Sequence, residues 1–211
     1  MAPGSGRPIL DLLVAFVLVH VVQILFSFVG LVGALFVLSS PLTTNPWTVF
    51  TSVYAHLNIW HLLSNSVALV LFGWPVARAT TRARFHAFFL LTGALAGMAQ
   101  IAVTNLVATL PLVGIEPTVG VLGASGAVFA LLGYLLASNP LSSGLGARID
   151  VPAWLTITVF VAVAGVLTFL TASPNAALVA HFTGIVLGLA AGSVNLLSVA
   201  PEPSSPDSGR N

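Results

Sequence analysis

Six long runs of apolar residues dominate the sequence, and short connectors rich in proline, glycine, serine and asparagine separate them. A helix needs about 20 apolar residues to cross the hydrocarbon core of a bilayer. The pattern therefore predicts six membrane-spanning helices, which cover about residues 9–38, 56–79, 84–106, 123–138, 151–171 and 175–199. The first is long enough to cross at a tilt, and the fourth is short. We expect one membrane domain over residues 1–200 and a disordered tail over residues 201–211.

The amino-acid composition is typical of a protein embedded in lipid. Hydrophobic residues make up 57% of the 211 residues and charged residues only 5%, against about 25% charged residues in a soluble domain. The mean hydropathy is +1.07. The net charge of +1 says nothing about nucleic acid, but the sequence has no basic patch, so we expect no nucleic-acid partner. The chain has no cysteine, which excludes disulfides, a thiolate nucleophile and a cysteine-based metal site. These features indicate an all-α membrane protein.

The basic residues predict an orientation. The chain has no lysine, and in a six-span arrangement every arginine falls on the same side of the membrane: Arg7, Arg78, Arg82, Arg84, Arg148 and Arg210. Five or seven spans would scatter them over both sides. Because arginine-rich loops stay in the cytoplasm, we expect a multi-pass cell-membrane protein, with both termini and the tail cytoplasmic.

A polar stripe occurs at the start of the second predicted span, where His56, His61 and Asn65 follow the pattern His-x4-His-x3-Asn. Residues four apart share a face of a helix. We therefore expect the side chains of His61 and Asn65 to point together, while His56 is offset around the helix. An interfacial location explains His56 equally well, because a ring with a polar tip tolerates that zone.

The fourth span opens with Gly123, Ser125 and Gly126 and places Phe129 one turn beyond the serine. Small residues allow helices in membranes to approach closely, so packing alone is one explanation of this motif. Ser125 and Phe129 are four residues apart and should lie on one face. Gly133 extends that face and is expected to admit another helix.

The sixth span carries a lone histidine, His181, followed by Gly184 and Gly188 on the same face. One explanation is a histidine that forms a hydrogen bond between helices. Ionisable residues within spans also tend to be functional.

The predicted topology brings these motifs to matching depth in the outer half of the membrane. A serine hydroxyl needs an adjacent base to act as a nucleophile, and His181 is the histidine placed to serve Ser125. No carboxylate is placed to complete a triad, because Asp11 and Asp150 should be cytoplasmic. The backbone N–H of Ser125, with His61 and Asn65, can supply donors for an oxyanion.

These three motifs, in this order and in these spans, resemble the rhomboid family of intramembrane serine proteases. The resemblance covers about residues 9–199. It implies a six-transmembrane-helix rhomboid-like bundle with Ser125 as nucleophile and His181 as general base. His61 and Asn65 would form the oxyanion hole, and His56, Gly123, Gly126, Phe129 and Gly184 would support the site.

The resemblance also implies the partners and the departures from the family pattern. Substrates would be single-span membrane proteins that enter laterally from the bilayer, past the second and fifth spans, and no metal or cofactor is expected. Many members have tyrosine at the position of Phe129, and arginine often follows the tryptophan where this chain has Trp47 and Thr48.

Two other classes stay open. A catalytically inactive rhomboid-like binder of membrane proteins typically lacks the dyad, which this chain keeps. A small transporter or channel would line its path with His61, Asn65 and His181, although few polar groups occur in the inner halves of the spans.

Overall fold

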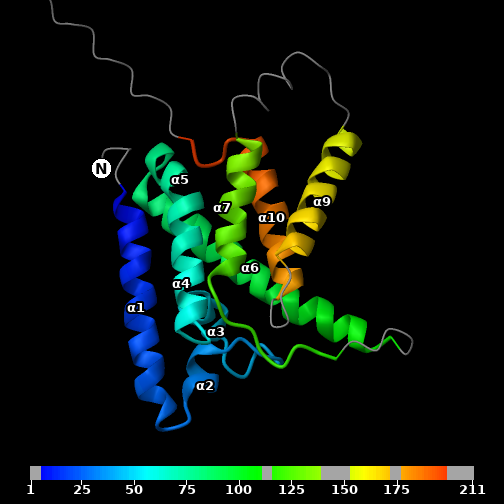
Figure 1. Cartoon of the computed structure of the whole chain (residues 1–211). Helices are drawn as coiled ribbons and strands as arrows, with labels where there is room; N and C mark the ends of the chain where they lie inside the picture. The colour runs from blue at the N-terminus through cyan, green and yellow to red at the C-terminus, as the bar shows by residue number, and fades with distance from the viewer. Residues whose placement is uncertain (1–5, 111–115, 139–152, 172–176, 199–211) are drawn as a thin grey trace, which may run out of the picture.

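The computed structural model describes residues 6–110, 116–138, 153–171 and 177–198 (Figure 1). In these residues the regular structure is helical, apart from one isolated bridge between Leu38 and Val121. The elements are α1 (Arg7–Ser27), α2 (Val32–Phe36), α3 (Thr48–Thr51), η1 (Ser52–Tyr54), α4 (Ile59–Ala68), η2 (Leu69–Gly73), α5 (Trp74–Ala79), α6 (Arg82–Ala108), α7 (Ser125–Ala137), α9 (Ala153–Leu170) and α10 (Leu178–Ser193).

Three helical stretches are long and apolar enough to cross a membrane: α1, α6, and the continuous stretch Ile59–Ala79 that joins α4, η2 and α5. Three shorter apolar helices lie in α7, α9 and α10. The predicted all-α membrane bundle is confirmed as a fold class, and the fourth apolar run does form a short helix.

The predicted extent of the first span is wrong at its far end. Helix α1 ends at Ser27 and α2 is a separate helix of five residues. Between them Gly30 has φ +71°, in the left-handed region where glycine is favoured. The sequence stays apolar from Phe28 through Leu38, so hydropathy alone does not mark the break.

The other boundaries differ from the predictions by a few residues. Helix α4 begins at Ile59 rather than at His56, because the Asn58 side chain caps it by accepting from the backbone N–H of His61. Helix α10 ends at Ser193 and is followed by Asn195 in a left-handed conformation with φ 50°. The predicted tail, residues 201–211, lies outside the described residues.

Helix α7 lies in the middle of the bundle, with α10 against it (Figure 1). The contact is backbone to backbone. A Cβ atom at Gly184, Gly188 or Gly192 would overlap the carbonyl oxygen of Gly126, Ala130 or Tyr134, respectively. The pairs recur every four residues on both helices, which is the small-residue packing common between membrane helices.

One end of the bundle gathers the arginines of the described residues. Arg82 donates two hydrogen bonds to the Asp11 carboxylate, at 2.7 and 2.8 Å, and His86 Nε2 lies 3.0 Å from the same carboxylate. These contacts join the starts of α1 and α6. Arg84 donates to the carbonyl oxygen of Ser198, beyond the end of α10. The predicted cluster is thus present for the described arginines, while Arg148 and Arg210 lie outside the described residues.

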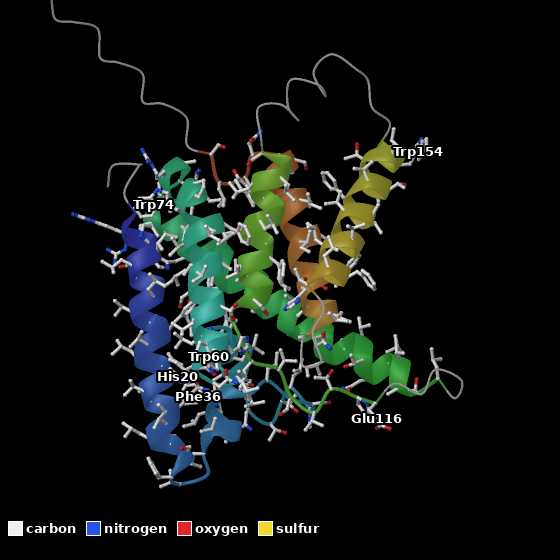
Figure 2. All side chains as sticks on the ribbon, in the orientation of Figure 1. His20, Phe36, Trp60, Trp74, Glu116 and Trp154 are labelled. Atoms are coloured by element: carbon white, nitrogen blue, oxygen red, sulfur yellow. The ribbon has the colours of Figure 1, made fainter. Side chains whose placement is uncertain are left out.

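Exposed tryptophans lie toward both ends of the bundle. Figure 2 shows Trp74 and Trp154 near the arginine-rich end, and Trp60 and Glu116 toward the opposite end. All three tryptophan side chains are exposed. Tryptophan is enriched where a membrane meets water, so their separation is typical of a protein that crosses a bilayer.

Candidate active site

The segment that leads into α7 is held by backbone hydrogen bonds. Leu38 and Val121 exchange two bonds, at 2.9 and 2.8 Å, and the N–H of Gly123 donates to the carbonyl of Ser52 at 2.9 Å. Gly123 has φ +133°, and a Cβ atom there would lie 2.7 Å from Cε1 of His61. Only glycine fits this turn, which delivers Ser125 to the first position of α7.

Ser125 and His181 are in hydrogen-bond contact. His181 Nε2 lies 3.0 Å from Ser125 Oγ, although the two residues are 56 positions apart in the chain. His181 is in the first turn of α10 and is buried. The distance fits a nucleophile paired with its base. Among the described residues, His181 Nδ1 has no hydrogen-bond partner.

Phe129 covers the imidazole. Its ring centroid lies 4.4 Å from that of His181, with the rings tilted by 41°. Phe129 follows Ser125 by one turn of α7, and both side chains contact His181. Gly126 is buried where α6, α7 and α10 meet, because a Cβ atom there would lie 2.7 Å from Cβ of Ala96 and 3.7 Å from the carbonyl oxygen of Ala180.

His61 and Asn65 lie on α4 and line the same cavity as Ser125. The Asn65 amide donates to the carbonyl of His61 at 2.9 Å, which leaves its second N–H for another acceptor. The N–H of Leu57 donates to His61 Nδ1 at 3.4 Å. In the neutral ring this bond assigns the proton to Nε2, the atom that would lie 2.9 Å from a Cβ at Gly123.

His56 packs against His61 inside the protein. It is 1% exposed, and its ring meets that of His61 edge-on at 5.3 Å and that of Phe16 at 4.8 Å. Its backbone N–H donates to the Gln23 side chain at 3.0 Å. His56 precedes α4, so the helical offset that we predicted for it does not apply, and its contact with His61 is that of a packing support.

These residues surround a cavity of about 890 Å³. Ser125 and His181 form part of its wall. The site residues that line it are His61, Asn65, Ser125, Phe129 and His181, joined by Gln100 and Thr118. Gln100 was not among the residues singled out from the sequence, although an amide within the apolar run of α6 is the kind of polar group that often marks function in a membrane.

The described carboxylates lie away from His181. Asp11 is paired with Arg82 at the arginine-rich end, and Glu116 is an exposed residue of the segment before α7. No group of three or more His, Asp or Glu side chains in the described ranges is arranged to hold a metal ion. The geometry supplies a hydroxyl, an imidazole and nearby N–H donors around one cavity.

Comparison with protein families identifies a family for this chain. The family model for the Rhomboid domain matches residues 43–197, which is more than half of the chain and includes the whole cavity-lining set from α4, α7 and α10. No curated protein matches the sequence.

Proposed function

Since the chain belongs to the rhomboid family, we propose that it is an intramembrane serine endopeptidase in which Ser125 and His181 act as a catalytic dyad. The family contains intramembrane proteases and also inactive members. The observation that carries the proposal is the 3.0 Å hydrogen bond between Ser125 Oγ and His181 Nε2 on the wall of the cavity.

In the first step, Ser125 Oγ attacks the carbonyl carbon of the scissile peptide, and its proton passes to His181 Nε2. A C–O bond forms, and the carbonyl oxygen takes the negative charge. His181 then gives the proton to the leaving nitrogen as the C–N bond breaks. The amine product departs and leaves an ester between Ser125 and the substrate.

Three donors serve the oxyanion. The backbone N–H of Ser125 is at the first position of α7, where helical N–H groups lack a partner within the helix. The Nε2–H of His61 and the second N–H of Asn65 face the same cavity. Preorganised donors of this kind usually supply the largest part of catalysis in acyl transfer.

In the second step, His181 removes a proton from a water molecule in the cavity, and the resulting hydroxide attacks the ester. The C–O bond to Ser125 breaks, the serine regains its proton from His181, and the new carboxylic acid is released. No metal or cofactor is needed to balance either step.

The substrates are single-span membrane proteins in this proposal. The protein acts in a cell membrane, crosses it several times, and has its arginine-rich end and both termini in the cytoplasm. The arginines support this orientation, because Arg78, Arg82 and Arg84 occur at one end of the bundle and basic residues are retained on the cytoplasmic side.

Labelling with a serine-reactive fluorophosphonate tests the proposal without a known substrate. We expect the wild-type protein in detergent to be labelled, and Ser125→Ala to lose the label. Ser66→Ala is the matched control, since Ser66 bonds only to the carbonyl of Leu62 in its own helix and should keep full labelling. A folded wild-type protein that does not react would contradict the proposal and favour an inactive member of the family.

Cleavage assays provide the second measurement. Ser125→Ala and His181→Ala should each abolish cleavage of a model single-span substrate, because each removes one half of the dyad. Thermal unfolding of both variants should match the wild type. Cleavage at the wild-type rate by either variant would refute the proposed dyad.

A further inference from the structure

A single buried amide connects the two halves of the site. Gln100 in α6 is 7% exposed, and both ends of its side chain are bonded. Its Oε1 accepts from the backbone N–H of Ala180 at 3.1 Å, and its Nε2 donates to Thr118 Oγ1 at 3.1 Å. Because a backbone N–H is only a donor, the amide oxygen must face Ala180.

The first of these bonds caps α10. Ala180 is the third residue of that helix, whose own N-cap residue, Ala177, provides no side-chain cap. N–H groups of the first turn lack partners within the helix, and here Gln100 supplies one from a neighbouring helix. The next residue is His181, so the cap acts on the turn that carries the imidazole.

The second bond acts on the segment before α7. The Thr118 hydroxyl oxygen accepts from the Gln100 amide, and the backbone N–H of Thr118 donates to Thr104 Oγ1 at 3.3 Å. Three residues later Val121 pairs with Leu38, and the segment then reaches Ser125. The same side chain thus contacts the element that presents the base and the segment that presents the nucleophile.

We propose that Gln100 is a positioning residue for the dyad, one that fixes the first turn of α10 so that His181 Nε2 stays within hydrogen-bond reach of Ser125. The role rests on the proposed function, because it concerns the alignment of that same pair. It differs from general helix packing: the cap is directional, and only an acceptor of the right length at position 100 satisfies the Ala180 N–H.

Four variants of the full-length protein in detergent test this role. Gln100→Leu keeps the approximate volume and removes both bonds. Gln100→Glu keeps an acceptor for the Ala180 N–H, and the Thr118 hydroxyl can donate to its other oxygen. Gln100→Asn keeps the amide but shortens it. Tyr134→Phe is the matched control, because the Tyr134 hydroxyl accepts from the backbone N–H of Leu197 at 3.2 Å, beyond the opposite end of α10.

The rate of fluorophosphonate labelling and the kcat and KM for a single-span substrate are the readouts. Gln100→Leu and Gln100→Asn should slow labelling and lower kcat by roughly 10- to 100-fold with little change in KM, as a misplacement of about 1 Å does. Gln100→Glu should stay within about threefold of the wild type on the same argument. Tyr134→Phe should lower the Tm and leave the labelling rate unchanged.

The outcomes separate the two proposals. A wild-type protein that is not labelled refutes the proposed function itself. A labelled wild type together with a folded Gln100→Leu that reacts equally fast refutes the positioning role alone. An equal loss of labelling rate in Gln100→Leu and Tyr134→Phe would show that the effect comes from a less stable fold. If Gln100→Leu does not fold, the comparison of Gln100→Glu with Gln100→Asn decides, and equal rates overturn the proposal.

Discussion

At the scale of single residues, a base without a carboxylate partner depends on packing for its orientation. His181 Nδ1 is buried and has no partner among the described residues, while the Phe129 ring lies against the imidazole. In a Ser-His-Asp triad the aspartate fixes the tautomer and stabilises the imidazolium. Here the orientation of His181 rests on Phe129 and on the first turn of α10.

The Asn65 side chain is expected to affect the rate of turnover. Asn65→Ala should lower kcat by about 100-fold or more, because one donor to an oxyanion contributes roughly that much in serine proteases. KM should change little, since the donor acts mainly on the transition state. Steady-state kinetics on a single-span substrate measure both quantities. Ser66→Ala, one residue further on α4, is the control, and an effect of Asn65→Ala confined to KM would contradict the assignment.

At the scale of elements, the backbone contact between α7 and α10 sets the geometry of the proposed dyad. Ser125 begins one helix and His181 lies in the first turn of the other. The glycine contacts continue from Gly184 to Gly192 along the pair. Because backbone atoms meet at all three glycines, the separation of the helices is fixed by atoms that have no rotamers to change.

A glycine pair tests this contact. Gly188→Ala should destabilise the protein by about 1–3 kcal/mol, the usual effect of overpacking, because its Cβ would overlap the carbonyl oxygen of Ala130. Gly165→Ala in α9 is the matched control, since nothing lies within 4 Å of a Cβ there. Alanine favours a helix over glycine by up to about 1 kcal/mol, so this control should be neutral or slightly stabilising. Thermal unfolding in detergent measures both, and equal Tm values would refute the close contact.

The elements also show what the sequence could predict. The helix positions could be predicted from the apolar runs, because both the lipid and the protein interior require apolar side chains. The break after Ser27 was missed, since Phe28, Val29 and Leu31 are as apolar as the helices around them. The proximity of Ser125 to His181 followed from topology. The Gln100 cap did not, because it joins α6 to a backbone N–H 80 residues away and a backbone group leaves no pattern in a sequence.

At the scale of the whole molecule, the two ends of the bundle differ. The described arginines gather at one end, while exposed tryptophans lie toward both. The Arg82–Asp11 pair joins α1 to α6 at one of them. Both partners are partly exposed, with 45% and 27% of their side-chain surface accessible, and exposed pairs contribute little to stability. The distribution of charge therefore concerns orientation in the membrane more than stability of the fold.

The absence of cysteine makes the orientation directly testable. Single cysteines at two exposed positions, Arg78→Cys at the end of α5 and Glu116→Cys in the segment before α7, should react differently with a membrane-impermeant maleimide in intact cells. We expect labelling of Glu116→Cys, and labelling of Arg78→Cys only after the membrane is opened. The reverse pattern would place the arginine-rich end outside and contradict the orientation.

The glycine contacts of α10 have a consequence for how this lineage can change over evolutionary time. Chemistry and architecture reside in different residues: Ser125 and His181 carry the proposed reaction, while Gly184, Gly188 and Gly192 hold the helices together. A descendant that exchanges the serine or the histidine keeps its fold and is free to take up a non-catalytic role. A descendant that exchanges the glycines loses stability together with the alignment of that pair. The glycines are therefore constrained whether or not the protein is catalytic, and only the serine–histidine pair can report activity.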